Sequence, residues 1–460
     1  MRKKSLFWLT LTLSALLTLI AACGTGTSTS NPTTAQHTSS NVAHPVATVP
    51  AGEDLYVLDG YTPFGSSPAT QQIVAFHPGS TNPATLVTLP AGLTSQDHQR
   101  LYTATAANGQ TTIAILNTRT GKTLHSFAIA GTYSTAGQSF ENAVISPDGR
   151  WLALRQLGQG SNSTTIALVD TQARRQVKTI QLDGSFDLDA ISSKGGMLYL
   201  LQDLKDVSGH YYVRAYNIRA SQLLSVIIAD KSELNDPRMI GTALMRQTSA
   251  NGSFAYTLYI DTAHNRAFVH ILPLSDEQEA GGPNQLPVPQ FARCIDLPVG
   301  KSADLLRYYT LVLSADGGTL YAVNGALGSV TEIGLSQDEY NIFSNNIVLQ
   351  NNFDPGRISM TNSDKTRVLR NGAVLSRDNT TLYFTGVNGI WAVDANTLQV
   401  KAHYLAQQAY TGLASSADGH ILYAVDPSQG ILLLNAATGQ TQRVIQGPAR
   451  TPWGIEWINN

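Results

Sequence analysis

The sequence predicts an all-β fold, a β-propeller of four-stranded antiparallel blades, and two observations carry this prediction. First, one phrase recurs, as SADGGTLYAV at 314–323 and as SADGHILYAV at 416–425. Second, the strand inside the phrase is apolar without alternation, which is typical of a strand buried on both faces. Radial repetition covers every sheet on both faces with like sheets, so a fixed-period repeat of this kind indicates a propeller.

Each repeat has four parts in order. An apolar run leads into a polar turn, then comes a second apolar strand, a third strand closed by Asp or Asn, and a fourth strand that runs outward. The first part reads AVISPDG (143–149), LVLSADG (311–317), AVLSRDN (373–379) and LASSADG (413–419). Asp-Gly between apolar residues is a strong hairpin signal, and a closing Asp or Asn favours an Asx turn.

Counting the repeats gives eight units, at 53–90, 92–131, 143–184, 189–229, 242–300, 309–350, 372–406 and 411–447. The first unit lacks an innermost strand, and WGIEWI (453–458) near the C-terminus is predicted to supply it and close the ring. Residues 53–460 allow 51 residues per blade for eight blades and 58 for seven. Propeller repeats span about 40–45 residues, so eight is favoured and seven is the alternative. The segment KSADLLRYY (301–309) predicts a short helix.

The recurring phrases resemble a known repeat family. SPDGRWLAL (146–154), together with the two phrases above, is similar to the repeats of YVTN-type propellers and, more broadly, to WD-type blades. The resemblance implies a propeller over most of the chain. Related propeller families include lactonases and dehydrogenases, whose sites lie in the central channel and are built from several blades.

The N-terminus predicts a lipoprotein signal. A basic start and an apolar stretch too short for a confident membrane span precede Ile20-Ala21-Ala22-Cys23, which resembles the lipobox of bacterial lipoproteins. The resemblance implies a signal peptide at 1–22, cleavage before Cys23 and a lipid on Cys23, which would hold the chain on the extracytoplasmic side of a cell membrane. An ordinary signal peptide with an accidental cysteine is the alternative.

The segment after the cysteine predicts a flexible tether, and the charge excludes one class of partner. Residues 24–50 contain 11 Ser or Thr and no Asp, Glu, Lys or Arg, so we divide the chain into a lipidated tether (23–52) and a propeller (53–460). The formal net charge is −2, and without the three basic residues of the signal it is −5. No basic run interrupts this balance, so we expect no nucleic-acid partner.

The short sequence motifs give little indication of a catalytic or cofactor-binding site. GKT (121–123) and GKS (300–302) lack the first glycine of a phosphate loop. LNTRTGKTLH (116–125) partly resembles the tryptophan-docking motif of quinoprotein propellers, with His125 in place of the tryptophan and Arg443 at the matching place in the last repeat. The carboxylates of Asp183, Asp187 and Asp189 are weak calcium candidates, with solvated loop acids as the alternative.

The sequence leaves the roles of several other side chains open. Cys294 has no disulfide partner once Cys23 is acylated and is expected to be a small buried hydrophobe. His264 and His270 face no obvious third metal ligand. Trp453, Trp457 and the tyrosines are expected to line a sugar- or peptide-binding face or to fill the core between blades.

These observations predict a binding or scaffold module rather than an enzyme. We expect a lipid-anchored propeller that binds an envelope protein, a cell-wall polymer or a small ligand, with no catalytic residue and no cofactor identified. The alternative is a lactonase-like hydrolase or a cofactor-dependent dehydrogenase with its site in the channel. That alternative predicts a channel-lining cluster of His, Asp, Glu or Arg with shifted pKa values.

Overall fold

The computed structural model describes residues 47–60, 71–135, 142–160, 162–205, 209–230, 236–274, 291–335, 348–356, 369 and 371–459. The predicted signal peptide, Cys23 and most of the predicted tether lie outside these residues. Val46–Asn460 forms one compact unit that contains every described strand, so this unit holds what it needs to fold by itself. No helix among the described residues is long and apolar enough to span a membrane.

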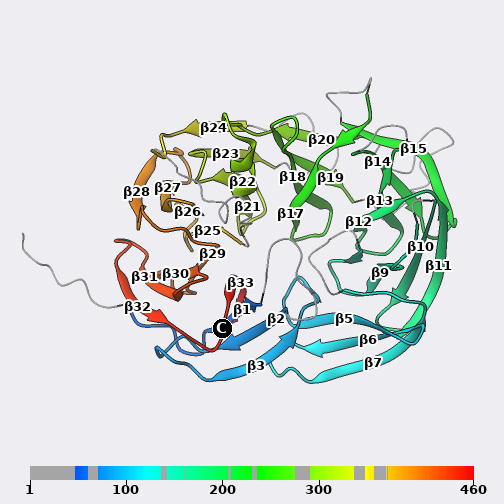
Figure 1. Ribbon diagram of the computed structural model, residues 1–460, viewed down its shortest axis with the longest axis horizontal. Helices are drawn as coiled ribbons and strands as arrows, with labels where there is room; N and C mark the ends of the chain where they lie inside the picture. Colours follow the sequence, from blue (N-terminus) through cyan, green and yellow to red (C-terminus); the bar gives the residue numbers. More distant parts are fainter. Residues whose placement is uncertain are drawn as a thin grey trace, which may run out of the picture. The chain divides into compact units, whose positions relative to one another are not determined.

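The described strands form eight four-stranded antiparallel blades arranged in a ring (Figure 1). The first four blades, each given from its innermost to its outermost strand, are β33 (Pro452–Asn459), β1 (Asp54–Asp59), β2 (Gln72–Phe76), β3 (Thr85–Pro90); β4 (Leu93–Thr94), β5 (Arg100–Ala107), β6 (Gln110–Asn117), β7 (Thr123–Ala130); β8 (Ala143–Ile145), β9 (Trp151–Arg155), β10 (Ser163–Asp170), β11 (Arg175–Asp183); and β12 (Phe186–Ile191), β13 (Met197–Asp203), β14 (His210–Asn217), β15 (Gln222–Asp230).

The last four blades follow in the same order: β17 (Thr242–Thr248), β18 (Phe254–Asp261), β19 (Arg266–Pro273), β20 (Phe291–Asp296); β21 (Tyr309–Leu313), β22 (Thr319–Asn324), β23 (Ser329–Gly334), β24 (Val348–Asn352); β25 (Ala373–Leu375), β26 (Thr381–Gly386), β27 (Gly389–Asp394), β28 (Val400–Tyr404); and β29 (Gly412–Ser415), β30 (Ile421–Asp426), β31 (Gly430–Asn435), β32 (Thr441–Ile445). The short strand β16 (Met239–Ile240) pairs with β14, and the 3₁₀ helix η2 (Ala303–Tyr308) precedes the sixth blade, where a short helix was predicted.

The prediction of eight blades and of closure by the C-terminal strand is confirmed. β33 pairs antiparallel with β1, with Leu55 opposite Ile458 and Tyr56 opposite Trp457. The first blade is thus built from both ends of the unit, and the ring has no open edge. The structure adds one feature that the repeats did not indicate. The outermost strands β15 and β20 pair in parallel at Ala229 and Phe291, which joins the fourth and fifth blades into one sheet.

Apolar burial between neighbouring blades holds the ring together. The second strand is largely buried in every blade except the second, where half of β5 is exposed, and every residue of β30 is buried. Each of the eight contacts between neighbouring blades contains its own hydrophobic cluster of buried side chains. Ala47 and Val49, in the last part of the predicted tether, pack against the cluster between the eighth and first blades.

The recurring phrase forms the same turn in five of the described blades, which we call the Ser-Asp turn. In the last blade the Ser416 hydroxyl donates to Asp418 Oδ1 over 2.6 Å and accepts from the Ile421 N–H over 2.9 Å. Gly419 follows with a φ of 77°, a left-handed conformation that glycine adopts without strain. The same bonds recur at Ser314 and at Ser376, so the repeat encodes a self-contained turn.

The tyrosine seven positions after the turn serine links each of the last three blades to the next. Tyr321 donates to the carbonyl of Ala395 over 3.2 Å, and Tyr383 donates to the carbonyl of Ala436 over 3.1 Å. Tyr423 donates to Glu53 in the first blade. These tyrosines therefore fill the core between blades, which is one of the two roles expected from the sequence.

Side chains of the outermost strands brace the blades a second time. The residue just after a β-bulge in the outer strand contacts the turn between strands three and four of the next blade. Lys178 donates to Ser221 Oγ over 2.6 Å, His125 contacts the Arg174 guanidinium over 3.3 Å, and Arg443 donates to the Gly79 carbonyl over 2.9 Å. His125 and Arg443 stand where the quinoprotein motif has its tryptophan, so other residue types take the bracing role at these positions.

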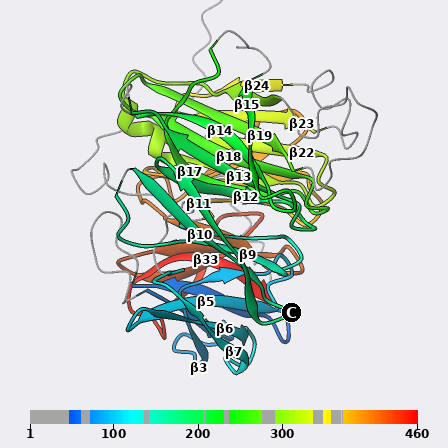
Figure 2. The same cartoon turned by 90° about the vertical axis from the view of Figure 1, so that its right-hand side faces the viewer.

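The unit has two faces, seen edge-on in Figure 2. Antiparallel strands place the turns between strands one and two, and between strands three and four, on one face, which we call the turn face. The turns between strands two and three and the connections between blades lie on the other, which we call the connection face. The helix η2 belongs to the connection face because it links the fifth blade to the sixth.

Candidate functional site in the central channel

A cavity of about 780 Å³ occupies the middle of the ring. The innermost strands of all eight blades contribute to its wall. Its volume lies within the roughly 300–1,000 Å³ of typical small-molecule sites. The residues that line the cavity therefore come from all parts of the sequence of this unit.

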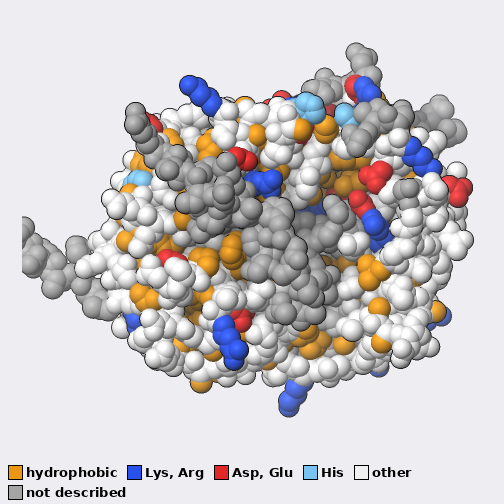
Figure 3. Space-filling view, in the orientation of Figure 1, with side chains coloured by type: hydrophobic (Ala, Val, Ile, Leu, Met, Phe, Trp, Pro, Cys, Tyr) orange, Lys and Arg blue, Asp and Glu red, His pale blue; other side chains and the backbone are white. Residues whose placement is uncertain are grey.

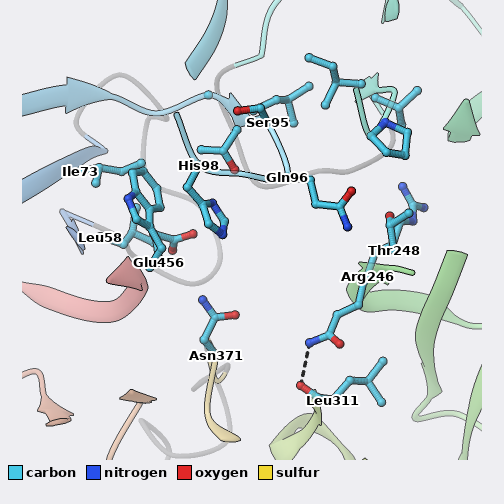
Figure 4. Close-up of a pocket in the computed structure, with 18 of the residues that line it drawn as sticks. Leu58, Ile73, Ser95, Gln96, His98, Arg246, Thr248, Leu311, Asn371 and Glu456 are labelled. Atoms are coloured by element: carbon cyan, nitrogen blue, oxygen red, sulfur yellow. Dashed lines mark hydrogen bonds between the residues drawn. The ribbon is translucent and has the colours of Figure 1, made fainter. Parts of the chain in front are cut away.

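Most of the wall is apolar, with a few polar side chains aimed inward. The inner strands present Val144, Ile191, Leu311 and Leu413, among others, to the cavity. Figure 4 shows His98, Gln96 and Asn371 pointing into this space from the second and seventh blades. An apolar wall with few convergent polar groups is typical of a ligand site.

A buried ion pair provides the charge in one wall. Arg246 on β17 lies 2.5 Å from Asp189 Oδ1 on β12, and the two side chains are 11% and 1% exposed. Arg246 Nε also donates to Thr257 Oγ1 over 3.2 Å. The second carboxylate oxygen of Asp189 is buried and has no hydrogen-bond partner among the described residues. A buried carboxylate is stable only when paired, so Asp189 depends on Arg246.

Three buried polar side chains stand behind this pair, between the fourth and fifth blades. The rings of Tyr211 and Tyr259 lie 5.9 Å apart, and the ring of His270 lies 6.1 Å from that of Tyr259. Burial raises the pKa of Tyr259 well above its usual value, and the Asp189 carboxylate adds to the rise. Burial lowers the pKa of His270, so this imidazole is neutral at neutral pH. This wall therefore contains polar side chains that are buried away from water, where electrostatic interactions are strong.

The opposite wall contains a stacked imidazole. The His98 ring lies parallel to Trp457, with centroids 5.2 Å apart, and Trp457 in turn stacks on Tyr56. Burial lowers the pKa of His98, against a smaller opposite effect of the Glu456 carboxylate. His98 is therefore a neutral base that faces the cavity, and Trp457 packs in the core between the first two blades and also lines the cavity.

Polar contacts also bridge the cavity wall at the turn face. Gln96 Nε2, in the Ser-Asp turn of the second blade, donates to the Ser249 carbonyl in the fifth blade over 3.2 Å. Gln247 Nε2 donates to the Leu311 carbonyl over 3.0 Å (dashed in Figure 4). The turns of blades two and five thus meet across the ring at the turn face.

The structure separates the three carboxylates that were weak calcium candidates. Asp187 pairs with Arg155, Asp189 pairs with Arg246 in the channel wall, and Asp183 is exposed at the end of β11. Among the described residues, no three His, Cys, Asp or Glu side chains stand close enough to hold a metal ion. Only Asp189 of the three belongs to the candidate site.

Other residues singled out by the sequence lie away from the cavity. Gly121 of GKT lies in the turn after β6, and Gly300 of GKS precedes η2. Cys294 on β20 is partly exposed and packs beside the cluster between the fourth and fifth blades. His264 is exposed beside Asp261, 2.6 Å away. Cys23 lies outside the described residues.

Sequence reasoning missed Arg246, although a signal for it exists. The residue three positions before each turn serine faces the channel. In four blades this position holds Ala143, Leu311, Ala373 or Leu413, whereas the fourth and fifth blades have Asp189 and Arg246. Counting back from the serines of the repeat would have identified this pair, because a charge in an apolar ring position needs a partner.

The chain resembles solved propeller structures only distantly. No protein-family model matches it, and no curated protein matches it in sequence. The structure of apo AztD from Citrobacter koseri is 12% identical with a TM-score of 0.47, covering 88% of this chain and 97% of that one. The periplasmic gluconolactonase PpgL from Pseudomonas aeruginosa is 15% identical with a TM-score of 0.42, covering 87% of this chain and 97% of that one.

A third solved structure is more distant still. TolB from Acinetobacter baumannii is 14% identical with a TM-score of 0.34, covering 63% of each chain. At this distance none of the three likenesses carries a function to this chain. The eight blades of the chain itself define its class, an eight-bladed β-propeller whose central channel contains a cavity.

Proposed function

We propose that the protein is a lipid-anchored, extracytoplasmic propeller that binds a small polar ligand in its central channel. The observation that carries the proposal is the cavity of about 780 Å³ with a buried Arg246–Asp189 pair in its wall. A buried pair of this kind is costly to maintain for stability alone, since apolar residues of similar size serve as well or better. Its place in the channel wall is a reason to keep it.

The polar groups define the ligand class. Gln96, His98 and Asn371 offer amide and imidazole groups, which donate and accept hydrogen bonds, and the Arg246–Asp189 ion pair beside them is neutral as a whole. The apolar remainder of the wall suits the carbon skeleton of the ligand. An uncharged compound with several hydroxyl groups, such as a sugar, fits this combination best.

The ligand proposal is tested with a paired substitution. The unit 46–460 is screened by thermal shift and then by calorimetry against sugars, sugar acids, their lactones and amino acids. Asp189→Leu/Arg246→Met removes both charges together, and Arg155→Met/Asp187→Leu removes another Arg–Asp pair, one that lies outside the cavity wall. We expect a sugar to raise the melting temperature of the wild type and of the control pair, and not of the channel pair. A ligand that binds all three proteins equally would contradict the channel site.

The anchor has its own test. In cells, full-length protein is compared with Cys23→Ala by membrane fractionation and by mass spectrometry of the N-terminal peptide. We expect the wild type in the membrane fraction with an acylated Cys23, and the variant released. In-cell cross-linking of both proteins then shows whether a captured partner depends on the anchor. An unmodified Cys23 in a membrane-bound protein would contradict lipid anchoring and leave the channel proposal untouched.

A hydrolase is the second candidate function, because one observation favours it. His98 is a base with a pKa lowered by burial, and it faces the cavity beside Glu456. A neutral imidazole in this place could activate a water against a lactone. Lactone hydrolysis that is lost in His98→Gln, with unchanged thermal stability, would establish this activity, and its absence against the same lactone panel would exclude it.

A further inference from the structure

The outer edge of three consecutive blades carries a concentration of positive charge on the turn face. The turns between strands three and four of the second, third and fourth blades, taken together with the strand ends beside them, lie within 117–122, 170–178 and 217–222. The cations in these segments are Arg119, Lys122, Arg174, Arg175, Lys178 and Arg219, which we call the basic rim. All except the half-buried Lys178 are exposed.

The three segments of the basic rim contain more cations than acids. The three segments contain one carboxylate, Asp170, which is buried and pairs with Arg150 at 3.0 Å. In the seventh blade the matching turn has Lys401 paired with Asp394 at 3.0 Å, and in the first blade it has only His77. The positive charge is therefore local, in a chain whose formal net charge is −2.

Contacts between blades make the basic rim one continuous surface. Arg174 of the third blade reaches His125 of the second, and Lys178 of the third blade donates to Ser221 of the fourth. These contacts place neighbouring turns side by side without neutralising their charge. On the connection face, shown in Figure 3, basic side chains instead stand apart, several of them next to acidic ones.

Exposed apolar side chains stand beside these cations. A β-bulge near the turn-face end of the outer strand turns one residue outward in each of the first three blades. These residues are Leu86, Leu124 and Val177, which are 56%, 45% and 38% exposed. Cations interleaved with exposed apolar side chains are the pattern of surfaces that lie on anionic lipid.

We propose that the basic rim docks onto an anionic phospholipid surface and sets the orientation of the propeller on the membrane. Lys and Arg side chains meet lipid phosphates, and Leu124 and Val177 reach into the headgroup layer. This inference goes beyond ligand binding in the channel. It rests on the proposed lipid anchor only because the anchor would keep the propeller close to a membrane. The described chain starts at Ala47, whose backbone pairs with the side chain of Gln442 in the outermost strand of the eighth blade, near the turn face.

The experiment uses the unit 46–460, which lacks Cys23, so its result is independent of lipid attachment. Sedimentation is measured with vesicles of phosphatidylcholine alone and with about one third phosphatidylglycerol. We expect binding to the anionic vesicles only, and loss of that binding when the ionic strength rises from about 0.1 M to about 0.5 M. Equal binding to both kinds of vesicle, or to neither, would overturn the proposal.

Variants locate the surface. Lys122→Glu/Arg175→Glu reverses two charges of the basic rim, and Lys205→Glu/Lys301→Glu makes the same change in charge on the connection face. The rim variant is expected to lose on the order of thirtyfold or more in vesicle partition, from about fivefold for each cation lost, and the control less than about threefold. Equal losses in the two variants would overturn the assignment to the rim, and matched melting temperatures verify that both fold.

Two further measurements separate lipid from other anions. Leu124→Ser/Val177→Ser is expected to weaken vesicle partition severalfold while leaving binding to soluble polyphosphate unchanged. An unchanged vesicle partition would overturn the role given to these two side chains. Tight binding to polyphosphate without binding to anionic vesicles would identify an anionic polymer as the partner and overturn the lipid proposal.

Discussion

The phenol of Tyr423 donates a hydrogen bond of 2.5 Å to Oε1 of Glu53, and this bond joins the last blade to the first. Oε2 of the same carboxylate accepts from the Ala417 N–H over 2.7 Å, and Glu53 is fully buried. In the two preceding blades the equivalent tyrosine donates to a backbone carbonyl. At the contact between the last and the first blade, which we call the seam of the ring, a charged side chain takes the place of that carbonyl.

Loss of this bond is expected to destabilise the seam more than the loss of its neutral counterpart. Tyr423→Phe should lower the free energy of unfolding by about 2–3 kcal/mol, because the bond has a charged acceptor. Tyr383→Phe, whose partner is the Ala436 carbonyl, should cost about 1 kcal/mol. Urea unfolding of both variants measures the difference, and equal losses would show that the carboxylate adds nothing at the seam.

Alkaline pH is expected to unfold the propeller through its buried tyrosines. Burial raises the pKa of Tyr321 and of Tyr383 to about 12, above the value near 10 of an unfolded tyrosine. Their contribution is complete below about pH 10 and is lost as the pH rises from about 10 to about 12, since the unfolded chain releases the protons first. The free energy of unfolding, measured at intervals from about pH 8 upward, should fall only above about 10. A fall that began near neutral pH would contradict this account.

The fold could be predicted because its information is local and repeated. The Ser-Asp turn, the apolar second strand and the closing Asp or Asn recur with little change. A blade can therefore be recognised from a stretch of about forty residues. Even closure by β33 was predictable, since the first repeat lacks a strand that the C-terminus supplies. The parallel pairing of Ala229 with Phe291 was not, because it depends on two outer strands that the repeat does not distinguish from others.

The candidate site was harder to predict because it is assembled from non-local positions. Asp189 was noticed only as one of three neighbouring acids, and its partner Arg246 lies 57 positions away. The pairing depends on the two residues occupying the same ring position in adjacent blades. His98 gave no signal at all, since its stacking on Trp457 brings the second repeat against the last ten residues of the chain.

Acid is expected to weaken the Ser-Asp turns. The Ser376 hydroxyl and the Thr380 backbone hold the pKa of Asp378 below its usual value, and Ser314 does the same for Asp316. A lowered pKa in the folded state gives stability that is present above the unfolded value of about 3.9 and is lost as the pH falls below it. Ser376→Ala should therefore reduce stability at neutral pH and flatten its dependence on acid pH. An unaltered acid transition in this variant would contradict the role of the hydroxyl.

Gly430 is expected to tolerate no side chain, because the next strand approaches it closely. Its φ is 109°, and a Cβ there would stand 2.1 Å from the Ile445 carbonyl oxygen. Gly158 has a φ of 73° and open space around the same position, which makes it a matched control. Gly158→Ala should cost about 1 kcal/mol for backbone strain alone, and Gly430→Ala about 2 kcal/mol more. Similar costs at the two glycines would mean that β31 and β32 can separate without penalty.

The pair in the channel wall is expected to behave as a unit whose halves cannot be removed singly. Arg246→Met leaves the Asp189 carboxylate buried and unpaired, which should lower the free energy of unfolding by about 3–5 kcal/mol. Asp189→Leu/Arg246→Met removes both charges and should recover most of that loss, since a well-packed apolar pair avoids the desolvation penalty. Denaturant unfolding of the two single variants and the double variant gives the coupling energy directly. If the double variant were as stable as the wild type yet bound no ligand of the panel that stabilises the wild type, the pair would serve recognition and not folding. If the double variant lost as much free energy of unfolding as the two single variants together, Asp189 and Arg246 would not be coupled. The stability of this wall would then depend on Thr257, Tyr259 and His270 instead.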